Sequence, residues 1–193
     1  MSSHHIVKDK QEPALLIANG QSCRSELMEE LLEWSPFVVV LDGAIGRVLD
    51  LGIKVDVLLG DFDRNELLIE EIKQSQFPIE IIYTPDQEKT DLEKGIESLI
   101  DRGFPSVNII WATGLRMDHT LANVFNLMKY KNEINIVMFD DHSKIIPLKS
   151  SPHFFEKWYK ANTIISLLPM PRADGIETQN LRFPLAIESL AIG

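Results

Sequence analysis

Three short acidic segments of the sequence carry residue types that are able to do chemistry. They read Gly60-Asp61-Phe62-Asp63, Asp86-Gln87-Glu88-Lys89-Thr90-Asp91 and Gly114-Leu115-Arg116-Met117-Asp118-His119. Directly before them lie three apolar runs that predict β-strands, Val55–Leu59, Ile79–Tyr83 and Val107–Trp111. Because the carboxyl ends of parallel strands gather at one edge of a sheet, where ligands bind, we expect a single acidic site. The ligand that such a site would take is a hard cation carrying phosphate groups.

The first segment suggests a metal site. Asp61 and Asp63 flank Phe62, and residues two apart in an extended chain point to the same side. Both carboxylates can therefore face one ion, and Mg²⁺ usually takes one or two carboxylates together with phosphate oxygens. Aspartates at strand ends also form turns and helix caps, so the pair alone supports either interpretation.

The other acidic positions are ambiguous when each is taken singly. Thr90-Asp91 and Asp118 stand at predicted helix starts, where such side chains cap the first turn. A helix start also favours anions, and Arg116 has the fork geometry that phosphates attract. Taken together, these positions favour ligand binding over capping, because five aspartates fall at the same predicted edge of the sheet: Asp42, Asp61, Asp63, Asp91 and Asp118. So many turn residues are not expected at one edge by accident, and we interpret them as one site.

The elements that must position this site alternate along the first two thirds of the chain. Further strands are predicted at Ala14–Ala18, Phe37–Leu41 and Ile134–Phe139. Helices are predicted at Glu26–Trp34, Gly43–Leu51, Asn65–Gln74, Asp91–Arg102 and Asp118–Lys131. This alternation indicates an α/β fold, an open and mainly parallel sheet with flanking helices. After residue 141 only short strand candidates remain, which predicts a small antiparallel β module: Ser143–Pro147, Thr163–Leu168, Gly175–Thr178 and Leu181–Phe183.

Composition excludes several classes of function. With 29 acidic and 19 basic residues the net charge is −10, so a nucleic-acid backbone is not expected as a partner. Cys23 is the single cysteine, which leaves no intrachain disulfide and no thiolate metal site. No apolar run approaches the roughly 20 residues of a membrane span, and the first residues lack the apolar stretch of a signal peptide. We therefore expect a cytoplasmic protein that does not bind membranes.

Four motifs in order resemble those of the thiamin pyrophosphokinase family. That family has an Asp-Gly-Gly-Ala-Asn-like turn, a Gly-Asp-Phe-Asp-Ser turn, an Asp-Gln-x-x-Thr-Asp segment and a Gly-Gly-Arg-x-Asp-His helix start. Here the first motif reads Asp42-Gly43-Ala44-Ile45-Gly46-Arg47, and the other three are the acidic segments described above. Order and approximate spacing match over residues 14–140, and the segments 165–169, 175–178 and 181–185 resemble the family's C-terminal β domain.

The resemblance implies a fold, a reaction and a set of site residues. It implies an α/β ATP-binding catalytic domain at residues 13–141, a β-sandwich thiamin-binding domain at 142–193 and a flexible tail at 1–12. The reaction would transfer pyrophosphate from Mg²⁺-bound ATP to the thiamin hydroxyl, in a homodimer with thiamin bound between subunits. Asp61, Asp63 and Asp91 would be catalytic and would hold Mg²⁺ and the triphosphate. The residues expected to contact the nucleotide are Asp42, Gly43, Gln87, Thr90, Arg116 and Asp118.

The sequence departs from the family pattern at three places. In the first turn Ala44 and Gly46 replace the usual second glycine and asparagine, and Arg64 stands where the family has serine. Family members usually continue through a Gly-Thr-Ser turn and a Ser-Asn segment that helps to form the thiamin pocket, whereas this sequence ends at Gly193. We therefore expect a C-terminal module that is truncated or that binds thiamin differently.

Three other hypotheses stay open. A pterin diphosphokinase would keep the metal site and change the acceptor pocket. A nucleotide or thiamin-diphosphate sensor would bind ligands without turnover. A phosphatase of the haloacid dehalogenase type has its Asp-x-Asp motif on the first strand, whereas Asp61 follows the third predicted strand, and Asn65 also breaks that motif. The sequence does not reveal which carboxylate accepts the proton of the alcohol.

Overall fold

The computed structural model describes residues 13–62, 66–149 and 154–192, and the chain divides into two units, Met1–Ser150 and Ser151–Gly193. The predicted flexible tail at 1–12 and the predicted site residue Asp63 lie outside the described residues. None of the helices within these ranges combines the length and apolar character needed to cross a bilayer.

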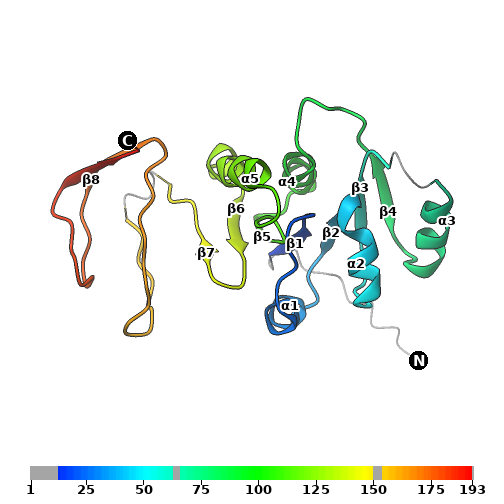
Figure 1. Ribbon diagram of the computed structural model, residues 1–193, viewed down its shortest axis with the longest axis horizontal. Coiled ribbons are helices and arrows are strands. Elements are labelled where there is room, and N and C mark those ends of the chain that lie inside the picture. Colours follow the sequence, from blue (N-terminus) through cyan, green and yellow to red (C-terminus); the bar gives the residue numbers. More distant parts are fainter. Residues whose placement is uncertain (1–12, 63–65, 150–153, 193) are drawn as a thin grey trace. The chain divides into compact units, whose positions relative to one another are not determined.

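The first unit contains a seven-stranded sheet in the order β4-β3-β2-β1-β5-β6-β7 among the described residues (Figure 1). Neighbouring strands are parallel except for the antiparallel pair of β6 and β7. In chain order the strands are β1 (Ala14–Ile17), β2 (Val38–Leu41), β3 (Val57–Gly60), β4 (Glu80–Tyr83), β5 (Ser106–Ile110), β6 (Asn135–Phe139) and β7 (Lys144–Ile145). The α/β class and the mainly parallel sheet predicted from the sequence are confirmed.

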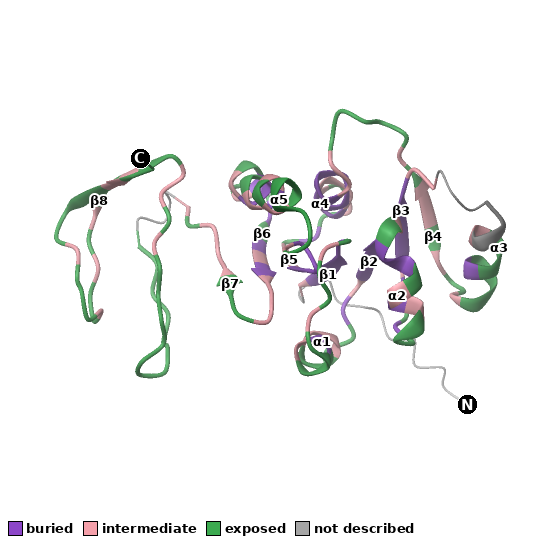
Figure 2. Ribbon diagram, viewed as in Figure 1, coloured by how far each residue is buried: buried purple, intermediate pink, exposed green. Residues whose placement is uncertain are grey.

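The central strands are apolar because helices cover both faces of the sheet. Every residue of β1, β2 and β3 is buried, and the register places Leu16 beside Val39 and Ile109. Strands buried on both sides form continuous apolar runs rather than alternating ones. Each such side chain contributes about 1.5–3 kcal/mol when it leaves water. The edge strand β4 is only partly buried, as Figure 2 shows.

Helices cover the two faces as separate layers (Figure 1). Met28, Val48 and Ile72 bring α1, α2 and α3 onto one apolar core. Ile96 of α4 and Leu127 of α5 belong to the other core. In α4 the buried apolar side chains Leu92, Ile96 and Leu99 recur at helical spacing, which gives that helix one apolar face. The helices are α1 (Ser25–Leu32), the short 3₁₀ turn η1 (Asp42–Ala44), α2 (Ile45–Asp50), α3 (Glu66–Ser75), α4 (Asp91–Asp101) and α5 (Met117–Tyr130).

The strand order reverses at β1. From β1 the chain adds β2, β3 and β4 in turn on one side, and then α4 leads back to β5 on the other side of β1. In open α/β sheets ligands bind beyond the carboxyl ends of the strands near such a reversal. The loops after β1, β2, β3 and β5 and the start of α4 are therefore the places where a site is expected.

The C-terminal unit contains antiparallel β structure, as predicted. Its described residues hold a two-stranded sheet of β8 (Arg172–Ile176) and β9 (Glu188–Ala191). Two of the short strand predictions, Thr163–Leu168 and Leu181–Phe183, are wrong, because neither segment pairs with a strand within the described range.

The boundary between the units also differs from the prediction. The sequence assigned Ser143–Pro147 to the C-terminal module, whereas Lys144–Ile145 forms β7 and pairs with Met138 and Phe139 of β6. Since this pairing belongs to the main sheet, the first unit extends to Ser150 instead of ending at residue 141.

Candidate active site

Asp42 is the residue on which the acidic site converges. It follows β2 in the η1 turn, is partly buried, and its Oδ2 accepts a hydrogen bond from the Phe62 amide at 3.3 Å. Burial raises the pKa of the Asp42 carboxyl, and the negative charges of Asp91 and Asp61 raise this pKa further. The structure thus brings together three predicted aspartates that are up to 49 positions apart in the sequence.

Asp61 is held at the carboxyl end of β3. Its Oδ2 accepts a hydrogen bond from Gln87 Nε2 at 3.2 Å, so the loop after β4 reaches across to the end of β3. The next residue, Phe62, has a φ of 51° and stacks its ring against Tyr83 with centroids 6.4 Å apart. This left-handed turn takes the chain out of the strand directly after Asp61. Gln87, predicted from its motif, therefore contacts a predicted metal ligand.

Thr90 and Asp91 begin α4, and Thr90 acts as its N-cap. The Thr90 hydroxyl accepts hydrogen bonds from the Glu93 amide at 3.3 Å and from Asn126 Nδ2 at 3.2 Å. The capping interpretation of Thr90 is therefore confirmed. Lys94, a residue that the sequence analysis did not single out, lies 3.4 Å from Asp91 with a side chain that is only 8% exposed. The sequence signal for this ion pair was the spacing of three residues between Asp91 and Lys94, because side chains three apart lie on the same face of a helix.

Gly43 allows a close approach between two loops at this edge. A Cβ at Gly43 would lie 2.1 Å from Asn19 Nδ2, so a larger residue here would displace the Asn19 side chain. Arg47 ties the same loop down, because its guanidinium donates to Asn19 Oδ1 at 2.8 Å and to the Gly20 carbonyl at 2.9 Å. The Arg47 guanidinium also lies 4.6 Å from the ring centre of Trp111, at the end of β5.

The sequence analysis gave no role to these switch-point residues. Asn19-Gly20 directly after a predicted strand was the available signal, since such a pair marks a turn. The contacts place Asn19 and Arg47 at the strand-order reversal, between the loops that follow β1, β2 and β5.

Arg116 and Asp118 lie at the start of α5 and pair with each other. Arg116 Nε is 3.1 Å from Asp118 Oδ1, and the two side chains are 69% and 65% exposed. The hydrogen bond from Arg116 lowers the pKa of Asp118 to about 2. Within the described part of the chain, neither side chain makes a hydrogen bond or ion pair with the aspartates around Asp42. Their contact with a nucleotide stays a prediction.

The aspartates fit a magnesium ion that arrives with phosphate groups. Among residues 13–62, 66–149 and 154–192, no three His, Cys, Asp or Glu side chains could hold a metal ion by themselves. The pKa of Asp42 is raised first by burial and then by the negative charges of Asp91 and Asp61, and a cation would offset those charges. Mg²⁺ commonly uses one or two carboxylates and completes its shell with phosphate oxygens and water. The donor set therefore suits a metal–polyphosphate complex.

Comparisons with known proteins agree with this arrangement. The model of the thiamin pyrophosphokinase catalytic domain matches residues 28–138, more than half of the chain. A comparison with curated proteins gave no match. The structure of thiamine pyrophosphokinase from Bacillus subtilis is 20% identical, with 93% of this chain and 85% of that chain covered and a TM-score of 0.62.

Two further structures resemble this one. Thiamin pyrophosphokinase from Geobacillus thermodenitrificans is 24% identical, with 67% of this chain and 60% of that chain covered and a TM-score of 0.54. A protein from Lactobacillus plantarum is 23% identical, with 66% and 61% covered and a TM-score of 0.55. The match thus spans about three fifths of the length of these two proteins. At these identities the structures establish the fold, and the family model, which covers the strands and helices that build the acidic edge, establishes that the chain belongs to the thiamin pyrophosphokinase family.

Proposed function

We propose that this protein transfers pyrophosphate from Mg²⁺-bound ATP to the hydroxyl of thiamin, giving thiamin diphosphate and AMP. The observation that carries the proposal is the convergence of Asp42, Asp61 and Asp91 at one edge of the sheet, within the region that the family model matches. Clustered carboxylates repel an anionic ligand unless a cation accompanies it, so this arrangement suits a triphosphate that is bound together with Mg²⁺.

In this proposal the aspartates bind and orient the metal–nucleotide complex. Asp61, Asp63 and Asp91 hold Mg²⁺, which neutralises charge on the phosphates when it is bound. Asp42, Gly43, Gln87 and Thr90 contact the nucleotide at the same edge of the sheet. Arg116 and Asp118 also contact it and give up part of their ion pair with each other to do so.

The chemical step is a displacement at the β-phosphorus of ATP. The thiamin hydroxyl oxygen forms a bond to that phosphorus, the bond from the phosphorus to the bridging α–β oxygen breaks, and AMP leaves with that oxygen. One of the site aspartates accepts the hydroxyl proton. Phosphoryl transfer of this kind depends mainly on positioning and on electrostatic stabilisation, which fixed carboxylates at strand ends can supply.

We also propose that the protein acts as a homodimer with thiamin bound between subunits. The support is the amount of apolar surface that the described residues leave exposed. Along one side of α5, Met117, Leu121 and Phe125 are 70%, 51% and 56% exposed, and Trp158 in the C-terminal unit is 84% exposed. Apolar patches of this kind mark protein interfaces, and a two-stranded sheet needs further packing to be stable. Light scattering coupled to size-exclusion chromatography would give twice the monomer mass, and a monomer would contradict this proposal.

The activity is tested by incubating the protein with Mg·ATP, with and without thiamin, and quantifying AMP and thiamin diphosphate. We expect AMP to form only when thiamin is present. AMP that forms with a pterin alcohol in place of thiamin would identify a pterin diphosphokinase. Nucleotide binding without AMP would identify a sensor, and inorganic phosphate released from simple esters would identify a phosphatase.

Substitution of the proposed metal ligands tests the site separately from the acceptor. Asp61→Asn and Asp91→Asn should each lower Mg·ATP-dependent turnover by at least about a hundredfold, because charge stabilisation is lost at the phosphates. Circular dichroism should show an unchanged fold, since both side chains are only partly buried and neither belongs to an apolar core. Wild-type turnover in either variant would refute the assignment of the metal ligands.

A further inference from the structure

The loop that joins β4 to α4, residues 84–90, presents two side chains in different directions. Gln87 reaches Asp61 at the end of β3, with Nε2 3.2 Å from the Asp61 Oδ2 atom. Lys89 turns instead to α4, where its Nζ lies 2.9 Å from each carboxylate oxygen of Glu97. The ends of the loop are held by Thr84, whose amide donates to the Gly60 carbonyl at 2.8 Å, and by Thr90, the N-cap of α4, so the Lys89 ion pair adds an anchor within the loop.

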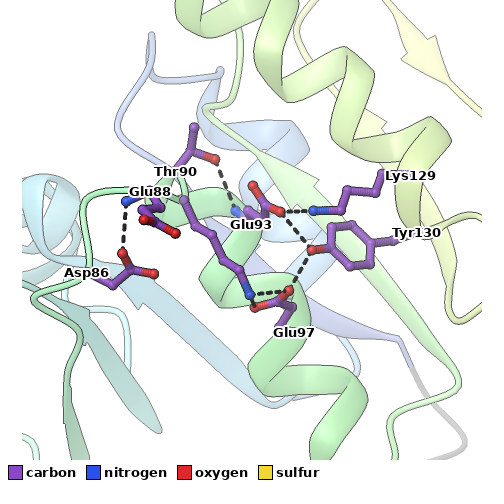
Figure 3. Close-up of polar contacts among 8 residues, drawn as sticks. Asp86, Glu88, Thr90, Glu93, Glu97, Lys129 and Tyr130 are labelled. Carbon is purple, nitrogen blue, oxygen red and sulfur yellow. Dashed lines mark hydrogen bonds and ion pairs between the residues drawn. The ribbon is translucent and has the colours of Figure 1, made fainter.

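Glu97 is itself fixed by α5. Its Oε1 accepts a hydrogen bond from the Tyr130 hydroxyl at 2.7 Å, and Tyr130 is only 3% exposed (Figure 3). Burial raises the pKa of Tyr130, so its hydroxyl keeps the proton that it donates. The same hydroxyl lies 2.9 Å from Glu93 Oε1, and Lys129 pairs with that carboxylate. A buried tyrosine thus fixes the position of the Glu97 carboxylate to which Lys89 binds.

The charges of this cluster balance, which keeps the anchor stable without a ligand. Lys89 and Lys129 offset Glu97 and Glu93 in two neighbouring ion pairs that share Tyr130. The hydrogen bond between Lys89 and Glu97 raises the pKa of Lys89 and lowers that of Glu97, so both groups stay charged at neutral pH. The loop anchor therefore persists under the conditions in which the protein would work.

We infer that the Lys89–Glu97 pair is a latch that holds the 84–90 loop on α4 and so positions Gln87 against Asp61. The inference rests on the proposed function for its effect on catalysis, and on geometry alone for its effect on the loop. Lys89 is in this view a positioning residue: its ammonium group contacts Glu97, eight positions along the chain, and acts on the site through Gln87. The competing role is a direct contact between Lys89 and a phosphate.

Hydrogen exchange of the ligand-free, full-length protein tests the latch without reference to activity. The pair is partly exposed, so Lys89→Met should accelerate amide exchange in residues 84–90 by only about threefold. The reciprocal exchange Lys89→Glu with Glu97→Lys should restore slow exchange in part, because it rebuilds the ion pair with its charges reversed but removes the carboxylate that accepts the Tyr130 hydroxyl. Lys73→Met is the matched control, since Lys73 is similarly exposed and pairs with Glu70 on α3. Unchanged exchange in Lys89→Met, or no recovery in the reciprocal variant, would overturn the inference.

Steady-state kinetics distinguishes positioning from direct contact. Loss of the Lys89–Glu97 ion pair lowers the fraction of molecules whose 84–90 loop is in the position that binds Mg·ATP. Lys89→Met should therefore raise the KM for Mg·ATP by about two- to threefold and leave kcat within about twofold. The reciprocal variant should return this KM part of the way to the wild-type value, since it rebuilds the ion pair without the Tyr130 hydrogen bond. If Lys89 contacted a phosphate directly, kcat would fall and the reciprocal variant would stay impaired. Absence of thiamin-dependent AMP in the wild type would refute the proposed function, while the exchange measurement would still decide on the latch.

Discussion

The close approach of Gly60 to Asp42 makes a single added methyl group a probe of the acidic site. Gly60 ends β3, and a Cβ built on it would lie 2.3 Å from Asp42 Cγ and 2.5 Å from Asp42 Oδ2. Real Cβ contacts stay beyond 3.0 Å, so Gly60→Ala must displace the Asp42 carboxylate by about 0.7 Å, the difference between these distances. The φ of Gly60 is not in the left-handed region, so the backbone can accept alanine and the effect should stay at Asp42.

The displacement sets the size of the expected effect. A misplacement of about 1 Å can cost a hundredfold in rate, so 0.7 Å should lower kcat/KM for thiamin-dependent AMP formation by roughly ten- to a hundredfold. The hydrogen bond from the Phe62 amide to Asp42 would weaken as well, which should cost about 1 kcal/mol of stability. The measurements are AMP release under saturating Mg²⁺ and a thermal denaturation curve for the same preparation.

Gly46→Ala is the matched control for this experiment. Gly46 lies in α2, four residues from Asp42, and an added Cβ would meet no heavy atom within 4 Å. Alanine is favoured over glycine inside a helix by up to about 1 kcal/mol, so this variant should melt slightly higher with wild-type turnover. Wild-type kcat/KM in Gly60→Ala would refute the reasoning, because it would mean that the position of the Asp42 carboxylate does not matter. An equal loss of kcat/KM in both variants would also contradict it, because the loss would then not be specific to the displacement of the Asp42 carboxylate.

Two further predictions concern the charges around the aspartates. Burial and the charges of Asp91 and Asp61 raise the pKa of Asp42, so its ionisation costs stability as the pH rises from the ordinary aspartate value of about 3.9 through this raised pKa. Asp42→Asn should therefore melt higher than the wild type at pH 7, with an advantage that shrinks toward pH 4; an advantage that grows on acidification would contradict this sign. Lys94→Met should cost about 1–3 kcal/mol in urea denaturation, because it leaves the Thr84 carbonyl, now 3.0 Å from Lys94 Nζ, without that donor. A cost below about 0.5 kcal/mol would show that water replaces the lysine.

The main sheet could be predicted from the sequence because its signals are local. Six apolar runs correspond to β1 to β6, and the five helices predicted from the sequence correspond to α1 to α5 among the described residues of the first unit. Both periodicities can be seen within a dozen residues. The β7 strand could not be placed in this way. Lys144–Ile145 is too short to show a period, and its membership in the main sheet depends on pairing with β6. Whether a short segment pairs with a strand cannot be seen from the segment alone. Thr163–Leu168 was therefore predicted as a strand although it is not one, and the strand Glu188–Ala191 was missed.

The site was predicted in part, and the missing part has a physical cause. Motif spacing named Asp42, Asp61 and Asp91, because each follows a strand or opens a helix where ligands are expected. Contacts that join distant segments leave no pattern in the sequence. The spacing from Asp91 places Lys94 on the same helix face, but only the structure shows that its side chain is nearly buried and reaches the Thr84 carbonyl. Only the structure likewise shows that Arg47 holds the loop after β1.

The path of α4 explains how three distant aspartates come to form one electrostatic unit. After β4 the chain reverses direction across the sheet, and α4 packs on β1, β2 and β3 on its way to β5. The start of this crossover therefore lies near the ends of β2 and β3, which brings Asp91 close enough to affect the pKa of Asp42. Lys94 offsets the charge of Asp91 from one side only, so the repulsion among the carboxylates is relieved incompletely by the protein. A bound cation would relieve this repulsion further, and phosphates that it carries would meet the amides at the start of α4. In the proposed function, the crossover that completes the fold would thus also help to bind a metal–polyphosphate complex.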